Sequence, residues 1–324
     1  MSSHSNRLFT FSVRAGGTLN ASTAARRVPR LRIRELYDKP EPTISFEFFP
    51  PKSAEAEQTL FTETVPALKK LGPSFISVTY GAGGGTRDTT LRIVNRVRRE
   101  FGIESMAHVT CVGSTKEMLA SVLDEAHALG IDNILALRGD PPKGQTVFQQ
   151  TEGGFAHAVD LIAFVKSRNC FGVGGACYPE GHLECPDKRL DWDRAAAKVD
   201  AGAEFLITQL FYDYRDFLDM EDYLRNRKKV QVPIIPGVLP FLSAEQIKRF
   251  TSLCGAKLPE PLQCRLQELA GDDEAVRQLG VEVCTDICRR LLEHGLQGIH
   301  FYCLNRVPSC AEIIRNLGLA PPLA

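Results

Sequence analysis

Short apolar segments alternate with amphipathic segments along most of the chain. Between them, apolar positions recur at helical spacing, for example in Thr115–Leu129, Phe155–Ser167 and Leu190–Ala201. Runs rich in β-branched and aromatic residues predict eight strands. These strands are Thr43–Pro50, Phe75–Gly81, Met106–Cys111, Asn133–Gly139, Val173–Tyr178, Phe205–Phe211, Pro233–Leu239 and Gly298–Leu304.

Eight strands that alternate with helices predict an α/β fold, a parallel eight-stranded (β/α)8 TIM barrel. The longest interval precedes the last strand and holds two helical patterns, Leu258–Ala270 and Asp273–Glu293, so an extra helix is expected there. The alternative is an open doubly wound sheet. It is disfavoured because the chain contains neither G-x-G-x-x-G nor G-x-x-x-x-G-K-[ST].

The first 34 residues differ in composition from the rest of the chain. They contain seven arginines and no acidic residue, and no apolar signal region follows. This composition predicts a disordered Arg-rich arm over residues 1–34 and a single catalytic domain over 35–324. An organellar transit peptide is the alternative for the arm.

Composition excludes several classes of protein. The formal net charge of the 324 residues is zero and the pI is near 7.0, which argues against binding driven by nucleic-acid phosphates. No apolar stretch approaches the roughly 18 residues that a membrane helix needs. The ten cysteines include no C-x-x-C pair, which predicts reduced thiols, no metal site and a cytoplasmic location.

Glu47 is the single charged residue of an apolar strand, Ile44-Ser45-Phe46-Glu47-Phe48-Phe49, which two prolines close. Burial disfavours the charged form of a carboxylate, so the pKa of Glu47 is expected to be raised. Such a group serves either as an acid near neutral pH or as one half of a structural ion pair. Both interpretations remain open from this segment by itself.

Polar residues recur where the predicted strands end, which is the face where barrel enzymes carry their chemistry. Each residue has a structural explanation, such as a packed histidine or a turn-forming aspartate. Together they predict one site. They are Glu47, Thr79, His108, Thr110, Arg138, Gly139, Asp140, Tyr178, His182, Gln209, Asn305 and Arg306.

The residue types at this rim favour proton transfer aided by a bound organic cofactor. Glu47 and Asp140, with Arg138 between them in sequence, suggest an acid and an anion with separate roles. The histidines are scattered, so no metal triad is expected. No lysine ends a strand, as a Schiff-base donor would.

The motifs at these strand ends closely resemble those of the methylenetetrahydrofolate reductase family. The resemblance runs in order from about Ile44 to the C-terminus. The chain is similar to the short catalytic form of the family, which lacks an S-adenosylmethionine-binding regulatory domain. The matching motifs are Ser45-Phe46-Glu47-Phe48-Phe49-Pro50-Pro51, Ser77-Val78-Thr79-Tyr80-Gly81-Ala82, His108-Val109-Thr110-Cys111, Ala136-Leu137-Arg138-Gly139-Asp140-Pro141, Tyr178-Pro179-Glu180-Gly181-His182, Lys198-Val199-Asp200-Ala201-Gly202-Ala203, Ile207-Thr208-Gln209-Leu210-Phe211 and Phe301-Tyr302-Cys303-Leu304-Asn305-Arg306.

The resemblance implies reduction of 5,10-methylenetetrahydrofolate to 5-methyltetrahydrofolate, a step of one-carbon metabolism that serves methionine synthesis. It implies a ping-pong cycle with non-covalent FAD, NADH or NADPH as co-substrate, and a homo-oligomer. Glu47 matches the general acid, and Asp140 matches a carboxylate that engages the pterin and tunes the flavin. The other positions that match folate contacts are Gln209, shared with the nicotinamide, Gln246, Phe250 and Arg306.

The resemblance also implies an FAD site, with Arg138 and Lys198 suited to the pyrophosphate. Phe155 replaces a tyrosine of the bacterial pattern. Arg194 and Ala197 replace an asparagine and an arginine, so Arg194 could restore the phosphate contact that Ala197 removes. The matching positions are Thr79, Tyr80, Ala82, His108, Arg138, Gly139, Asp140, Phe155, Ala156, Tyr178, His182, Asp191 and Lys198.

Two other classes of protein remain as alternatives. Another flavin-dependent barrel oxidoreductase would share the fold but not Glu47 together with Gln209. A binding protein without activity would be expected to lose the acid, whereas this chain has both Glu47 and Asp140.

Overall fold

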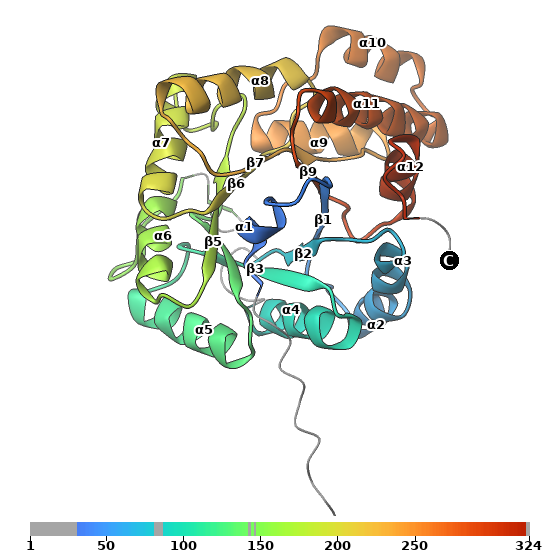
Figure 1. Cartoon of the computed structure of the whole chain (residues 1–324). Coiled ribbons are helices and arrows are strands. Elements are labelled where there is room, and N and C mark those ends of the chain that lie inside the picture. Colours follow the sequence, from blue (N-terminus) through green and yellow to red (C-terminus); the bar gives the residue numbers. More distant parts are fainter. Residues whose placement is uncertain (1–30, 81–86, 142–143, 146, 322–324) are drawn as a thin grey trace, which may run out of the picture.

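A parallel sheet curls into a nearly closed ring in the computed structural model, which describes residues 31–80, 87–141, 144–145 and 147–321 (Figure 1). All strand pairs in the described residues are parallel, and the order is β7-β6-β5-β4-β3-β2-β1-β9-β8. The predicted barrel is therefore confirmed. The strands are β1 (Thr43–Phe48), β2 (Phe75–Val78), β3 (Glu104–Thr110), β4 (Asn133–Leu137), β5 (Gly172–Cys177), β6 (Phe205–Thr208), β7 (Ile234–Ile235), β8 (Gly237–Val238) and β9 (Gly298–Phe301).

The strand count differs from eight because the seventh predicted strand is divided. Pro236 separates β7 from β8, and proline has no N–H to donate to a sheet. Before Pro236 the chain pairs with β6, and after it the chain pairs with β9. The Pro236 carbonyl still accepts from the His300 N–H at 2.9 Å. The divided strand thus joins the two sides of the ring.

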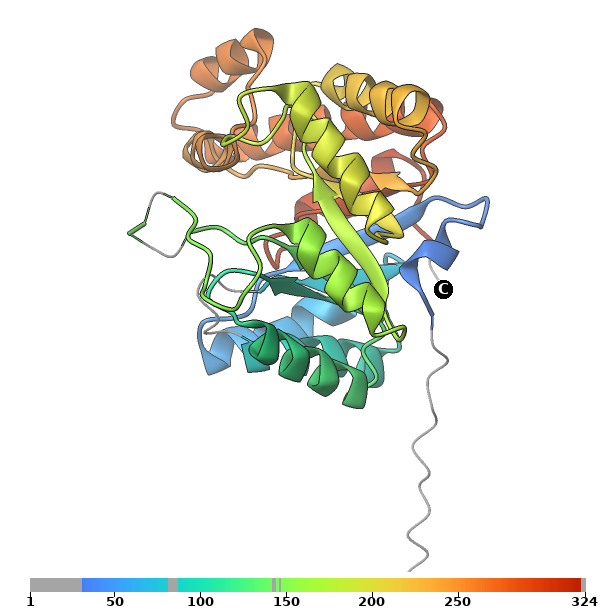
Figure 2. The same cartoon turned by 90° about the vertical axis from the view of Figure 1, so that its left-hand side faces the viewer.

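Helices surround the sheet, as Figures 1 and 2 show. Side chains of Thr115 and Asp187 cap α5 and α7, so these helices begin close to the predicted positions. The extra helical elements expected before the last strand are α10 and α11. The helices are α1 (Ile33–Leu36), α2 (Ala54–Thr59), α3 (Val65–Lys69), α4 (Arg87–Phe101), α5 (Lys116–Ala128), α6 (Ala158–Ser167), α7 (Lys188–Asp200), α8 (Tyr214–Asp222), α9 (Ala244–Cys254), α10 (Glu260–Glu268), α11 (Asp273–Glu293) and α12 (Pro308–Asn316), with π-helical turns η1 (Leu60–Thr64) and η2 (Tyr223–Arg227).

The short helix α1 lies at one end of the barrel and fills its interior (Figures 1 and 2). Ile33, Leu36 and Tyr37 form a buried cluster with inward side chains of the strands, among them Phe75 and Phe205. The Ile33 N–H also donates to Asn133 Oδ1 at 2.9 Å. The described structure begins at Leu31, four residues before the expected domain boundary at residue 35. Residues 1–30 of the predicted arm lie outside the described residues.

Side chains alternate between the helices and the barrel interior along each strand. On β1, Ile44, Phe46 and Phe48 belong to the large core between sheet and helices. Ser45 and Glu47 therefore share the opposite, interior face. This alternation carries Glu47 into the barrel near the carboxyl ends of the strands, at the end away from α1.

Candidate active site

Glu47 lies buried in the barrel between two histidines. Its side chain is 9% exposed, and its Oε2 is 3.5 Å from Nε2 of His108 on β3 and 3.6 Å from Nε2 of His300 on β9. Both contacts are longer than a hydrogen bond. Cys303 Sγ lies 3.1 Å from the Glu47 backbone carbonyl and donates to it. The carboxyl group is therefore positioned at the mouth of the barrel without a full ion pair.

His300 is a member of this cluster that the sequence interpretation missed. The side chain is fully buried, and its Nδ1 lies 2.8 Å from Ser45 Oγ. Its Nε2 lies 3.4 Å from Ser77 Oγ. A histidine inside the apolar run of β9 is the same signal that singled out Glu47. The prediction considered residues at the strand ends, whereas His300 lies four residues before Leu304, the predicted end of the last strand.

His108 is neutral near pH 7. Its imidazole pKa is lowered to about 4, chiefly by burial and to a lesser extent by the nearby His300, while the Glu47 carboxylate opposes the shift. Among the described residues, His108 Nε2 and Thr110 Oγ1 are buried without a hydrogen-bond partner. A buried polar atom in this condition costs free energy that a bound ligand would relieve.

Acid is expected to destabilise the native protein through His108. The pKa is near 6.5 in the unfolded chain and about 4 in the native state. As pH falls below 6.5, protons bind the unfolded imidazole first, so the free energy of unfolding falls by about 3 kcal/mol between pH 6.5 and 4. Urea unfolding of His108→Gln should show a shallower decline over this window than wild type.

The exposed His157 provides the matched control. His157→Gln should keep the wild-type pH dependence. An equal decline in wild type and His108→Gln would contradict the assignment of this stability loss to His108.

A second cluster surrounds Arg138 at the end of β4. Its guanidinium makes two hydrogen bonds to the Glu184 carboxylate, at 2.6 and 2.7 Å, and lies 4.9 Å from the ring centre of Phe148. The ion pair with Glu184 raises the pKa of Arg138 further. Gly139 follows at φ 85°, where a Cβ would lie 2.6 Å from Val112 Cγ1. Asp140 is exposed.

Lys198 and Asp191 of α7 extend this cluster towards β5. The Lys198 ammonium donates to the Ala176 carbonyl at 2.6 Å and lies 5.9 Å from the ring centre of Tyr178. Burial lowers the pKa of Lys198, and Asp191 opposes that shift. The Tyr178 ring packs edge-on against His182, with centroids 4.8 Å apart. An ammonium has three donors, so Lys198 retains the capacity to bind an anion.

The predicted folate-binding residues come from three other elements. Gln246 and Phe250 are four residues apart on α9, so they share one face of that helix. The Gln246 Oε1 accepts from the Leu242 N–H at 2.8 Å, which leaves its amide N–H groups available. Gln209 follows β6 and is half-buried, whereas Arg306 follows β9 and is exposed. In the part of the chain described, no hydrogen bond or ion pair joins these side chains to one another.

The remaining predicted FAD positions are more scattered. Thr79 follows β2, and its backbone carbonyl accepts a hydrogen bond from the Thr90 hydroxyl. Phe155 packs against Phe164, 5.3 Å between ring centroids. Tyr80 and Ala156 are half-buried, and Arg194 is exposed on α7. Ala82 lies outside the described residues.

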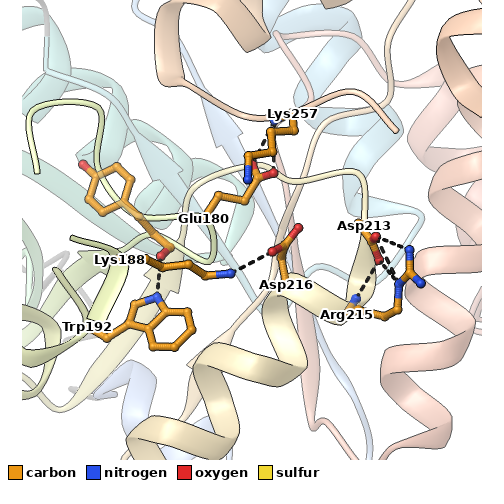
Figure 3. A network of polar contacts seen from close by, with 8 residues as sticks. Glu180, Lys188, Trp192, Asp213, Arg215, Asp216 and Lys257 are labelled. Carbon is orange, nitrogen blue, oxygen red and sulfur yellow. Dashed lines mark hydrogen bonds and ion pairs between the residues drawn. The ribbon is translucent and has the colours of Figure 1, made fainter. Parts of the chain in front are cut away.

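Glu180 is a half-buried carboxylate, and the sequence interpretation did not select it as a site residue. It accepts from the Lys257 backbone N–H at 3.1 Å and so ties the loop after β5 to the segment after α9 (Figure 3). Burial raises the pKa of Glu180 to about 7, the nearby Asp216 adds to the shift, and the Lys257 N–H opposes it. Lys188 pairs with Asp216 at 2.8 Å beside it. This network fixes the position of α9 relative to the rim.

The described residues include neither a cluster of three or more side chains placed to hold a metal ion nor a helix long and apolar enough to cross a membrane. What they contain is a (β/α)8-barrel protein with a buried acid and a cationic cluster at the catalytic face. The sequence model of one family, methylenetetrahydrofolate reductase, matches residues 32–318. The chain therefore belongs to the methylenetetrahydrofolate reductase family.

Individual proteins that are similar in sequence to this chain carry the name of the same family. The chain is 38% identical over 299 residues to methylenetetrahydrofolate reductase (NADH) 1 of Arabidopsis thaliana, covering 89% of this chain and 50% of that protein. It is 35% identical over 285 residues to 5,10-methylenetetrahydrofolate reductase of Salmonella typhimurium, and this match covers 86% of this chain and 92% of the bacterial protein. The chain thus spans about half the length of the plant relatives it matches.

A solved structure shares the fold at low sequence identity. It is described as an uncharacterized protein from Clostridium thermocellum that binds two copies of 5-methyl-5,6,7,8-tetrahydrofolic acid. The TM-score is 0.61 with 16% identity, and the match covers 90% of this chain and 99% of that one. At this identity the likeness supports the barrel and nothing finer.

Proposed function

We propose that the protein reduces 5,10-methylenetetrahydrofolate to 5-methyltetrahydrofolate with NADH or NADPH and a non-covalently bound FAD. The observation that carries the proposal is Glu47, a buried carboxyl group at the barrel mouth of a chain that belongs to this family. The names of the plant relatives specify NADH, which favours that nucleotide. The ten cysteines include no C-x-x-C pair, which supports a reducing compartment such as the cytoplasm.

Glu47 would deliver a proton to N10 of the folate and so open the five-membered ring to a reactive iminium. His108 and His300 hold the carboxyl group in place from two sides without neutralising it through a short ion pair. The apolar outer face of β1 anchors the strand, so the acid does not move away from the site. Asp140 and Gln209 would orient the pterin, and Phe250 would pack against an aromatic part of the ligand.

The residues around Arg138 fit an FAD molecule. Arg138 and Lys198 supply positive charge for a pyrophosphate, and Arg194 lies on the same helix as Lys198. His108 and Thr110 have buried polar atoms without partners beside the mouth. FAD, when bound, would carry the hydride between nucleotide and folate. The Arg138 guanidinium would then exchange Glu184 for the cofactor.

The proposal predicts a yellow protein with ping-pong kinetics. NADH should bleach the flavin absorbance anaerobically in the absence of folate, and methylenetetrahydrofolate should restore it. Initial-rate plots against nucleotide at several fixed folate concentrations should be parallel, because one rim serves both substrates in turn. A folded, colourless protein that cannot be reconstituted with FAD would overturn the proposal. Flavin reduction without folate-dependent reoxidation would favour another flavin-dependent barrel oxidoreductase.

A further inference from the structure

Helix α9 carries two of the proposed folate contacts, yet few of its side chains are buried. Of its eleven residues, Ile247 and Thr251 are buried. Gln246 and Phe250 are half-buried, and they share one face of the helix because they are four residues apart. Few buried side chains are typical of a segment with low local stability. The position of α9 relative to the barrel therefore depends on contacts at its ends.

The two ends of α9 are held in different ways. At the first turn, Gln246 Oε1 accepts from the Leu242 N–H at 2.8 Å, a contact within the same segment of chain. At the other end, Gly255 terminates the helix at φ 78°. Two residues later, the Lys257 N–H lies 3.1 Å from each carboxylate oxygen of Glu180, which follows β5 (Figure 3). Glu180 thus ties the end of α9 to a different part of the barrel.

The loop after β5 also packs on the end of α9. A Cβ on Gly255 would lie 2.4 Å from Cδ2 of Leu183, so the loop and the helix approach closely there. A cavity of about 10 Å³, too small for a substrate group, lies at this junction and is lined by Gln209 and Cys254 among others. Cys254 is four residues from Phe250. The face of α9 that carries the proposed folate contacts therefore continues to the junction.

The charges around Glu180 favour its hydrogen bonds to the segment after α9. Lys188 of α7 is engaged by Asp216 of α8 at 2.8 Å (Figure 3). Burial raises the pKa of Glu180 to about 7, and the Lys257 N–H is the largest influence that opposes the shift. A half-buried carboxylate therefore costs free energy at this place, and its hydrogen bonds to the Lys257 N–H offset part of that cost.

We propose that Glu180 is a positioning residue that holds the end of α9 against the loop after β5 and so keeps Gln246 and Phe250 in place for the folate. The inference rests on the proposed function, which assigns these two side chains to folate. Glu180 acts through α9 and takes no part in proton transfer from Glu47. It reduces the conformational freedom that α9 loses when folate binds. Without this tether, folate binds more weakly while the chemical step is unchanged.

The test separates the two half-reactions of the holoenzyme. Glu180→Ala should raise the KM for methylenetetrahydrofolate by about tenfold, the usual effect of one lost hydrogen bond to a charged group. The kcat at saturating folate should stay within about twofold of wild type, and flavin reduction by NADH within about threefold, because only folate binding is altered. Glu180→Gln keeps a carbonyl acceptor without the charge, so its KM should rise by a smaller factor.

Two matched variants identify the contact that matters. Lys257→Ala keeps the backbone N–H from which Glu180 accepts, so it should keep the wild-type KM for folate. Glu245→Gln removes an exposed carboxylate from α9 itself and should also keep the wild-type KM. Hydrogen exchange followed by mass spectrometry should be faster across α9 in Glu180→Ala than in wild type. This measurement needs no turnover.

The opposite results would overturn the inference or the proposed function separately. If wild type is active and Glu180→Ala keeps both its folate KM and the slow exchange of α9, Glu180 does not position the helix. Equal slowing of both half-reactions in Glu180→Ala, without rescue in Glu180→Gln, would make Glu180 a residue of general stability. A KM in Lys257→Ala as high as in Glu180→Ala would overturn the tether through the backbone. If wild type reduces no folate, the proposed function itself fails.

Discussion

Glu47→Gln is expected to slow the folate half-reaction by about 10²–10⁴, the range typical of a positioned general acid. Glutamine keeps the shape of the side chain but has no acidic proton. Reduction of the flavin by NADH needs no proton from Glu47, so that half-reaction should stay within roughly tenfold of wild type. Anaerobic single-turnover absorbance of the flavin measures the two steps separately.

Glu104→Gln is the matched control for this experiment. Glu104 is also a buried carboxylate, but it begins β3, so it lies at the opposite end of the barrel and near Arg98. Both half-reactions of Glu104→Gln should match wild type. Equal slowing of both steps in Glu47→Gln would mean that Glu47 is a structural carboxylate. No slowing at all would transfer the role of acid to Asp140.

Ile33→Ala is expected to lower the free energy of unfolding by about 2–5 kcal/mol, the usual cost of truncating a large buried aliphatic side chain. Ile33 is fully buried where α1 closes the barrel, and it packs in the cluster with Phe75 and Phe205. The backbone hydrogen bond to Asn133 is unchanged by the substitution, so the loss measures packing. Urea unfolding followed by circular dichroism gives the difference from wild type.

Glu35→Ala tests whether the effect belongs to the buried face of α1. Glu35 is exposed on the same four-residue helix, so its substitution should change the free energy of unfolding by less than about 0.5 kcal/mol. Similar losses in both variants would mean that helix propensity, and not the filling of the barrel, is what Ile33→Ala disturbs.

The ion pair between Arg138 and Glu184 shows how the cationic cluster is organised in this structure. Two short hydrogen bonds occupy the guanidinium that the proposal assigns to FAD. Glu184 is exposed, so solvent screens the pair and its contribution to stability is small. An anion with better geometry can therefore replace Glu184 at little cost.

The sequence by itself determined the barrel and the position of the buried carboxylate Glu47. Strands and helices have different hydrophobic periods, so local patterns were enough to locate β1 to β6, β9 and the helices α5, α6, α7, α10 and α11. Thr115, the first residue of one predicted helical segment, caps α5 in the structure. A charged residue inside an apolar run identified Glu47, because the alternation of a strand fixes which face each side chain occupies.

Only the tertiary structure decided what surrounds Glu47. His300 is more than two hundred residues away in sequence, yet the pairing of β1 with β9 brings its ring beside Ser45 and Glu47. The division of the seventh strand at Pro236 depended on pairing with two different neighbours. Likewise, α1 has too few residues to show a period, and its burial follows from the space that the closed ring leaves. Closure of the barrel brings together residues that are far apart in sequence, so these contacts cannot be predicted from any local pattern of residues.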